Sequence, residues 1–145
     1  MNVQRGFTLL ELLIALAIAA ILLTIALPSF EAWLQRERHT RSVNQLQAMY
    51  NFARSEAVKR EANVVMAISA DTLSVLTASD EQLLRQFHLS PQLIYDLTDV
   101  ELQATGQVPM AAQWQVRDPR GLVADRCLNI LPSGQLTVLA ASCTS

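Results

Sequence analysis

Histidine, cysteine and glycine are scarce in this sequence, which holds two, two and four of them among 145 residues. The histidines are His39 and His88, and together with the two cysteines they do not make the ligand spacing of a metal site. The sequence also has no glycine-rich phosphate loop and no HExxH pattern, and neither histidine has a nucleophile motif near it. We therefore expect no metal, no cofactor and no catalytic residues, and an enzyme is the disfavoured class.

The sequence also has no internal repeat, no low-complexity stretch and no linker rich in proline, glycine or serine. Its length supports one folded domain with its own core in addition to a membrane segment. Residues 1–62 hold seven Lys/Arg and five Asp/Glu, a net charge of +2, whereas residues 63–145 hold four and eight, a net charge of −4. An acidic C-terminal region disfavours non-specific binding to nucleic acid or to anionic lipid.

One long apolar run near the start is the main feature that is present. All 21 residues from Phe7 to Leu27 are apolar except Thr8, Glu11 and Thr24. As a helix they reach roughly 31 Å, enough to cross a hydrocarbon core. A secretory signal peptide or signal anchor is the alternative, but the run is too long, contains an acid and precedes no small-x-small cleavage site. We expect a transmembrane helix in which Glu11 has a function, because a carboxylate in a membrane is costly.

Residues 6–11 read Gly-Phe-Thr-Leu-Leu-Glu and lead directly into the apolar helix. This pattern resembles the N-terminal signature of type IV pilins and type II secretion pseudopilins over residues 5–30. The resemblance implies that a prepilin peptidase removes the leader, residues 1–6, by cutting after Gly6. It also implies N-methylation of Phe7 and assembly of the apolar helices into a filament core. Pro28 lies where such pilins often carry a helix-bending proline.

Glu11 has a clear physical role in such a filament. Cleavage would place a cationic amine on Phe7, four residues before Glu11, and the carboxylate of one subunit could neutralise the amine of a neighbour. Because an unpaired charge is very costly in an apolar core, this pair would set the axial register of the subunits. The alternative is a carboxylate that only extends to the membrane interface.

The charges that flank the apolar run conflict with an exported C-terminal region. A cluster of Arg36, Arg38, His39 and Arg41 follows the run, whereas only Arg5 and the amine precede it. The positive-inside rule alone would place the C-terminal region in the cytoplasm, although the cluster begins nine residues beyond the run. We interpret the cluster as a solvated helix face, with lipid headgroups or acidic neighbouring subunits as alternative contacts.

The helix is predicted to continue beyond the membrane to about Glu61, with a bend at Pro28 and Ser29. Residues 30–62 form its amphipathic half, because apolar residues recur there at steps of three and four: Val43, Leu46, Met49, Tyr50, Ala53 and Ala57.

After Asn63 the pattern changes to short β-forming runs separated by turn residues. Strands are expected at residues 64–68, 72–77, 83–89, 100–104, 112–117, 127–131 and 135–139. The predicted fold class is α+β, in which a long N-terminal helix packs on a β-rich head. The helix is membrane-spanning over residues 7–29 and amphipathic over residues 30–62, and the head comprises residues 63–145.

The order of the elements resembles the minor pilins and pseudopilins of the GspH and FimT/FimU type, whose penultimate strand and turn look like residues 129–134. In members of this group that bind DNA, the turn glycine is followed by Arg-x-Arg, but Gly134 is followed here by Gln-Leu-Thr. Nucleic acid is therefore not an expected partner. Arg117, Arg120 and Arg126 could line a phosphate-contacting loop, but acids are interleaved with them, and we interpret the cluster as surface ion pairs.

Cys127 and Cys143 have 15 residues between them. In an exported head this pair is expected to form a disulfide that closes the last loop, which the chain-entropy model values at about 3 kcal/mol. Two free thiols in a cytosolic protein are the alternative.

These features together predict a minor type IV pilin, a structural subunit that helps to initiate or cap a pilus. A minor pseudopilin of the type II secretion system is the first alternative, and a DNA-uptake minor pilin is disfavoured. A membrane-anchored binding module would have no use for Gly6, Phe7 or Glu11. The expected partners are other major and minor pilins or pseudopilins, the prepilin peptidase and, before assembly, the inner membrane. The expected location is the inner membrane with a periplasmic head, and then the pilus or pseudopilus, its tip included.

Overall fold

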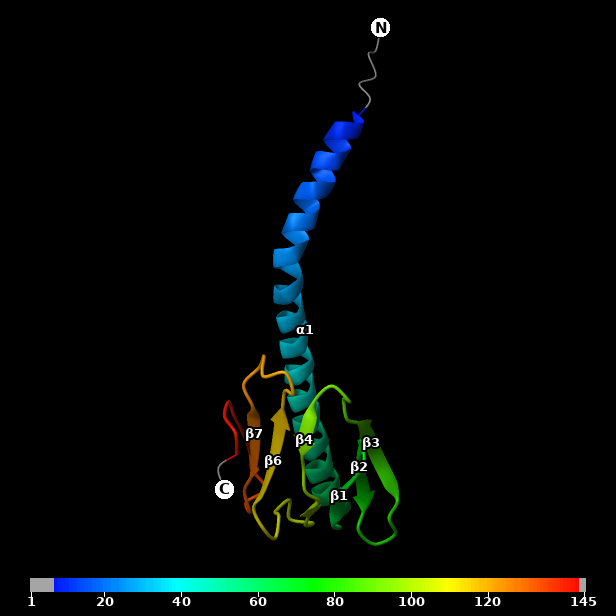
Figure 1. The fold of residues 1–145 in the computed structure, drawn as a ribbon. Helices are drawn as coiled ribbons and strands as arrows, with labels where there is room; N and C mark the ends of the chain where they lie inside the picture. Colours follow the sequence, from blue (N-terminus) through cyan, green and yellow to red (C-terminus); the bar gives the residue numbers. More distant parts are fainter. Residues whose placement is uncertain (1–6, 144–145) are drawn as a thin grey trace. The chain divides into compact units, whose positions relative to one another are not determined.

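The computed structural model describes residues 7–143, apart from the side chains of residues 25–28. The predicted leader, residues 1–6, and the side chain of Pro28 lie outside the described residues. The chain divides into two compact units, Met1–Leu34 and Gln35–Ser145. The helix α1 (Leu9–Arg60) belongs to both units (Figure 1).

In the first unit, Thr8 provides the start of α1. Its Oγ1 accepts a hydrogen bond from the amide of Glu11 at 3.3 Å, and its carbonyl accepts one from the amide of Leu12 at 3.2 Å. A threonine followed three residues later by a glutamate is a capping-box sequence, which satisfies amides that the first helical turn leaves unpaired. Farther along, the Thr24 hydroxyl donates to the carbonyl of Ile21 at 2.7 Å, so this polar group is bonded within its own helix.

In the second unit, α1 ends at Arg60, which confirms the predicted end to within one residue. Glu61 takes a left-handed backbone with φ of 51°. The amide of Ala62 then donates to the carbonyl of Ala57 at 3.2 Å, and the amide of Glu61 donates to the carbonyl of Val58 at 3.3 Å. This is the Schellman pattern that closes a helix C-terminus.

The head contains eight strands in the described residues, all paired in antiparallel fashion. One sheet has the order β3-β2-β1-β5 and the other β4-β6-β7-β8. The C-terminal half of α1 lies beside both sheets (Figure 1), so the predicted α+β class is confirmed. The strands are β1 (Val64–Ser69), β2 (Thr72–Thr77), β3 (Leu83–His88), β4 (Ile94–Asp96), β5 (Val100–Leu102), β6 (Ala112–Arg117), β7 (Arg126–Ile130) and β8 (Leu136–Leu139).

Strand β4 is absent from the predicted strands. Its three residues follow Pro91 and are too few for an alternating pattern to be recognised. The strand exists because Tyr95 pairs with Val116 on the edge of the second sheet. The other seven strands correspond to predicted runs.

One core lies between α1 and the two sheets. The helix contributes the apolar face predicted from its spacing, and the strands contribute alternate residues such as Met66 from β1 and Trp114 from β6. Trp114 is fully buried, its indole N–H donates to the carbonyl of Thr98 at 2.8 Å, and its ring meets Tyr50 edge-on at 6.3 Å. Trp114 therefore belongs to the core.

Candidate functional site

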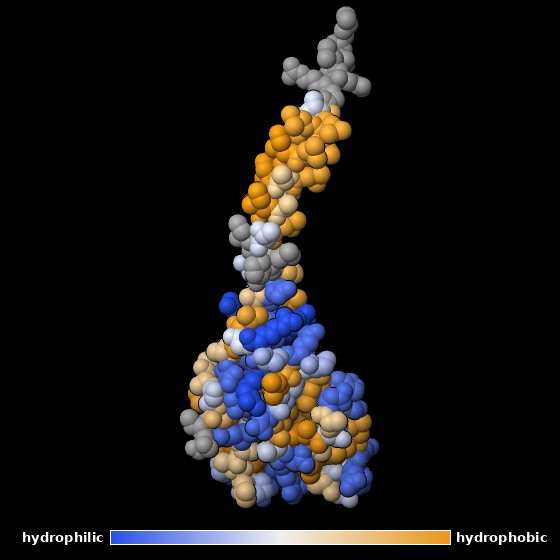
Figure 2. Space-filling model, viewed as in Figure 1, coloured by the Kyte–Doolittle hydropathy of each residue, from blue (hydrophilic) through white to orange (hydrophobic). Residues whose placement is uncertain are grey.

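The first unit exposes apolar side chains in every direction around α1. Ten large apolar residues between positions 9 and 23 are 53–78% exposed, and Figure 2 shows this surface as nearly continuous orange. Because 3.6 residues complete a turn, these residues cover the whole circumference of the helix. A helix that is apolar all round needs lipid or other helices around it. The residues are Leu9, Leu10, Leu12, Leu13, Ile14, Leu16, Ile18, Ile21, Leu22 and Leu23.

The helices were compared with the length and hydropathy that a membrane span requires. Within the described residues, no single helix is long and apolar enough to cross a membrane. Two α1 segments, Leu9–Thr24 and Ser29–Arg60, pass that test only as a bent pair, on length and composition alone. Residues 25–28, which separate the two segments, are those whose side chains the structure does not describe.

The predicted processing and assembly residues lie at the start of this apolar segment. Phe7 is 74% exposed and precedes the helix, and Glu11 is exposed in its first turn. Gly6 lies outside the described residues. The carboxylate of Glu11 is thus on the surface of an apolar helix, where it is accessible to a partner from another chain.

In the second unit, a buried hydrogen bond joins α1 to the loop after β6. The side-chain amide of Gln35 donates to Asp118 Oδ1 at 2.8 Å. The two carboxylate oxygens of Asp118 also accept the amides of Arg120, Leu122 and Val123 at 2.8–3.2 Å. Asp118 therefore stabilises the conformation of its own loop and connects that loop to the helix.

This arrangement lowers the pKa of the Asp118 carboxyl. Burial is the largest single influence and acts to raise the pKa, but the hydrogen bonds from the Arg120 amide, Gln35 and the next two amides together outweigh it. The carboxylate is thus ionised at neutral pH. Asp118 is one of the acids interleaved with Arg117, Arg120 and Arg126 that were interpreted as partners in surface ion pairs. For Asp118 that interpretation is wrong, because its side chain is buried and bonded to amides.

Two more polar residues of α1 point into the head. His39 is 1% exposed, and its Nε2 lies 3.2 Å from the carbonyl oxygen of Val116, so Nε2 carries a proton. Its Nδ1 has no hydrogen-bond partner within residues 7–143. Ser42 Oγ lies 2.5 Å from the hydroxyl of Tyr95, which also accepts the amide of Ser90 at 3.1 Å. The interpretation of His39 as part of a solvated basic face is wrong.

The turn before β8 also contacts the helix. The Tyr50 hydroxyl donates to the carbonyl of Gly134 at 3.1 Å, and Arg54 Nε donates to the carbonyl of Gly106 at 3.0 Å. Burial raises the pKa of the Tyr50 phenol, with the charge of Arg54 opposing, so the hydroxyl stays a donor. Gly134 has φ of +78°, and a Cβ there would lie 1.9 Å from the Gly106 oxygen. Only glycine fits this position.

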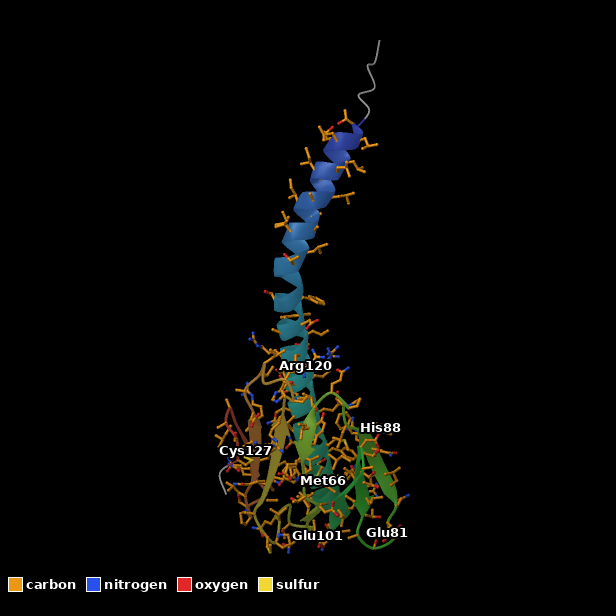
Figure 3. All side chains as sticks on the ribbon, viewed as in Figure 1. Met66, Glu81, His88, Glu101, Arg120 and Cys127 are labelled. Carbon is orange, nitrogen blue, oxygen red and sulfur yellow. A yellow bond between two sulfur atoms is a disulfide. The ribbon has the colours of Figure 1, made fainter. Side chains whose placement is uncertain are left out.

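Cys127 and Cys143 form the predicted disulfide, with their Cα atoms 5.0 Å apart. Cys127 is buried on β7 (Figure 3), and the bond ties the chain beyond β8 to that strand. Neither cysteine is free.

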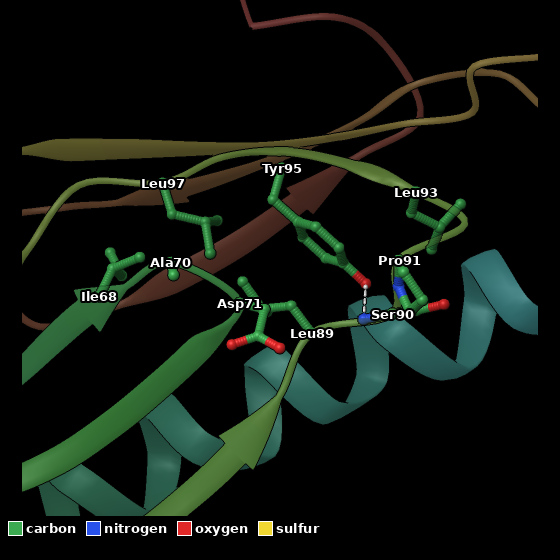
Figure 4. A pocket seen from close by; sticks show the side chains of 9 residues that line it. All are labelled: Ile68, Ala70, Asp71, Leu89, Ser90, Pro91, Leu93, Tyr95 and Leu97. Atoms are coloured by element: carbon green, nitrogen blue, oxygen red, sulfur yellow. Dashed lines mark hydrogen bonds between the residues drawn. The ribbon is translucent and has the colours of Figure 1, made fainter.

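Two small cavities lie on either side of the segment 89–92, between β3 and β4. The first holds about 240 Å³ and is lined mainly by apolar residues of both sheets, with the Tyr95 hydroxyl turned to the Ser90 amide (Figure 4). The second holds about 260 Å³ and is lined mainly by cationic and polar side chains. In the part of the chain that the structure describes, no cluster of three or more His, Cys, Asp or Glu residues could hold a metal ion.

Two family models match the sequence. Residues 1–27 match the prokaryotic N-terminal methylation motif, and residues 42–140 match the type II transport protein GspH. The second match runs from the core-facing part of α1 to the end of β8.

Individual proteins that are similar to this chain are also pilus proteins. Two fimbrial proteins of Pseudomonas aeruginosa are each 35% identical to this chain over 107 residues, which is 72% of this chain and 70% of each relative. Fimbrial protein Q of Moraxella bovis is 48% identical over 48 residues, 33% of this chain and 31% of that protein. The structure of the type IV minor pilin FimU of Pseudomonas aeruginosa is similar with a TM-score of 0.61, over 72% of this chain and 90% of FimU. At 20% identity this last similarity shows a shared fold.

Proposed function

The chain belongs to the GspH family of type IV pilin-like proteins, and from this premise we propose that it is a minor type IV pilin that helps to initiate or cap a pilus. Its proposed partners are other pilins, a prepilin peptidase that cuts after Gly6, and the inner membrane that holds the subunit before assembly. The proposed location is the inner membrane with a periplasmic head, followed by the pilus.

The observation that carries this proposal is the uncovered apolar surface of α1 next to a single acid. Burying one fully exposed Leu or Ile side chain contributes about 1.5–3 kcal/mol. The ten residues, each more than half exposed, therefore strongly favour insertion into lipid or into a bundle of like helices. Lipid satisfies the apolar side chains but not Glu11. A bundle that offers the N-terminal amine of a neighbour satisfies both.

A minor pseudopilin of the type II secretion system is the second candidate. The GspH model itself describes a type II transport protein, whereas the relatives that cover the larger part of this chain are fimbrial proteins. Because those relatives are fimbrial proteins, we favour a role in a pilus. The residues after Gly134 do not include the Arg-x-Arg of DNA-uptake members.

The test is to follow the protein into surface filaments. An epitope-tagged chain, expressed at native level, should appear in sheared pili in small amounts relative to the major pilin, and should copurify with pilus components. Copurification with the pseudopilins of a secretion system, and absence from sheared pili, would assign it to that system instead.

Processing provides an independent test. Gly6→Leu should leave an unprocessed precursor in the membrane, heavier than the mature wild-type chain by the mass of residues 1–6. Mass spectrometry of the wild-type protein should also find a methylated Phe7 at its N-terminus. A wild-type chain that keeps its first six residues, or that is cut after Leu27, contradicts the pilin assignment.

A further inference from the structure

The second cavity of the head has the composition of an anion site. Its volume is about 260 Å³, and its lining contains two guanidinium groups, one imidazole, two hydroxyls, two carboxamides and one aromatic ring, but no carboxylate. The lining residues are Arg38, Arg41, Ser42, Gln45, Phe87, His88, Ser90 and Gln92.

Nitrogen-bearing side chains line this cavity on two walls. Arg38 and Arg41 are three residues apart on α1, so both lie on one side of the helix, while His88, labelled in Figure 3, is the last residue of β3. His88 Nδ1 lies 3.2 Å from Thr72 Oγ1, whose own proton goes to Asp71. Nδ1 therefore donates to that oxygen, and Nε2 can donate to an anion only when the ring is doubly protonated.

Hydrogen bonds hold the two walls together. The Ser42 hydroxyl and the Ser90 backbone amide both bond to the Tyr95 hydroxyl, and the side-chain amide of Gln35 donates to the carbonyl of Gln92 at 3.4 Å. Ser42 is 4% exposed. The cavity is thus formed in the folded head before any ligand arrives, which reduces the entropic cost of binding.

The bonds that already engage the two arginines are weak. Arg41 contacts Glu37 at 3.3 Å, with side chains 72% and 49% exposed, and a pair so exposed contributes little. Arg38 donates to the Gln35 amide oxygen at 3.4 Å. An anion between the two guanidinium groups would form charge-assisted and bidentate hydrogen bonds, which are stronger.

We propose that this cavity binds a phosphate group. A phosphate presents oxygens in several directions, and donors converge here from two walls, with hydroxyls and amides between the cations. The acidic net charge of residues 63–145 opposes diffuse binding of anions, so binding must depend on this local constellation. The phosphate could belong to a phospholipid headgroup or be free in solution. The proposal is independent of the proposed function.

The test uses the full-length chain in detergent micelles. Inorganic phosphate is titrated against chloride at matched ionic strength, and binding is followed by calorimetry and by the NMR signals of the arginine Nε–H groups. We expect saturable binding that perturbs Arg38 and Arg41. Arg38→Gln and Arg41→Gln should each weaken it about tenfold, as expected for the loss of one charge-assisted contact.

Matched variants separate a site from a diffuse charge effect. Arg36→Gln removes the same charge from the same turn of helix, but Arg36 does not line the cavity, so binding should be unchanged. Glu37→Gln breaks the ion pair of Arg41 while keeping both arginines, and it should not weaken binding. No saturable binding up to about 20 mM phosphate, or equal weakening by Arg36→Gln and Arg38→Gln, would overturn the proposal.

A second titration identifies the source of the phosphate. Glycerophosphoglycerol carries the phosphodiester of an anionic lipid headgroup without its acyl chains. Binding of this diester, weakened by Arg38→Gln, supports a lipid headgroup as the ligand. Binding of inorganic phosphate alone supports a free phosphate or a phosphomonoester.

Discussion

Glu11 is the only charged residue between Gly6 and Glu31. It follows the Thr8 cap in the first turn of α1, where a carboxylate also interacts favourably with the helix dipole. Its backbone amide therefore belongs to the helix start, whereas its exposed side chain remains available to a neighbouring subunit.

We predict that Glu11→Ala is cleaved after Gly6 like the wild type but enters filaments poorly. The neighbouring amine on Phe7 would then lie in an apolar core without an anion, which is strongly unfavourable. The measurement compares the mature band in membranes with the amount in sheared filaments. Glu11→Asp serves as the control and should be intermediate, because it keeps the charge and loses reach. Wild-type incorporation of Glu11→Ala would refute the pairing with the amine.

Gly134 and Gly121 offer a matched pair for backbone strain. Both have positive φ, of +78° and +67°, but a Cβ at Gly121 would have no atom within 4 Å. We predict that Gly121→Ala costs about 1–2 kcal/mol, the price of the left-handed backbone alone. Gly134→Ala should cost about 2–5 kcal/mol, because it also forces the Gly106 turn away. Urea unfolding of the two variants, followed by circular dichroism, measures the difference, and equal costs would contradict the close packing of these turns.

The lowered pKa of Asp118 predicts an acid-dependent loss of stability. A carboxyl whose folded pKa lies below its unfolded value contributes stability that is fully present above the unfolded pKa and is lost as the pH falls through the folded one. The unfolded value is about 3.9, so the loss should begin near pH 4 and continue as the pH falls further. Asp118→Asn should be less stable than the wild type at pH 7 and should lose less stability over this acidic range.

The pKa values of Glu56 and Asp80 are lowered as well, by hydrogen bonds from Arg60 and Thr77 respectively. Both groups remain in the Asp118→Asn variant, so the acid transition should become shallower without disappearing. Unfolding curves collected at several pH values test this, and parallel curves for the two proteins would show that Asp118 does not contribute.

At the scale of elements, α1 shows which buried residues the spacing of apolar residues can predict and which it cannot. The apolar positions from Val43 to Ala57 were predicted to face the core, and they do. Gln35, His39 and Ser42 continue the same face toward the N-terminus, but they are polar, and hydropathy assigns them to solvent. Their three- and four-residue steps were the available signal. They are buried because the head supplies a partner for each of them, namely Asp118, Val116 and Tyr95.

The last strands depend on the disulfide. We predict that replacing both Cys127 and Cys143 by serine costs about 2–5 kcal/mol, and that β8 then loses protection first, because only β7 pairs with it. Hydrogen exchange monitored by mass spectrometry measures this order. The control is β6, held between two strands, which should lose little protection. Two alkylatable thiols in wild-type protein from the cell envelope would contradict both the bond and an exported head.

For the whole molecule, the charge distribution sets the response to nucleic acid. We predict that the full chain in detergent does not bind duplex DNA at physiological salt, because residues 63–145 carry a net charge of −4 and Gly134 precedes Gln135, Leu136 and Thr137. Fluorescence anisotropy at several salt concentrations tests this. Salt-sensitive binding at micromolar concentration would overturn the prediction. It would direct attention to Arg117, Arg120 and Arg126, which lie in or beside the loop that Asp118 organises.

The sequence by itself determined the apolar helix, its end near Glu61, seven of the eight described strands and the disulfide pair. The helix and the strands follow from local periodicity, and the disulfide follows from the two cysteines together with the resemblance to exported proteins. Only the tertiary structure decided the division of the strands into two sheets, the short strand β4 and the cavity between Arg38 and His88. These depend on residues far apart in the chain, whose polar groups are buried only because each finds a partner across the fold. A hydropathy pattern records the preference of each residue for water, but not the partner that makes its burial possible.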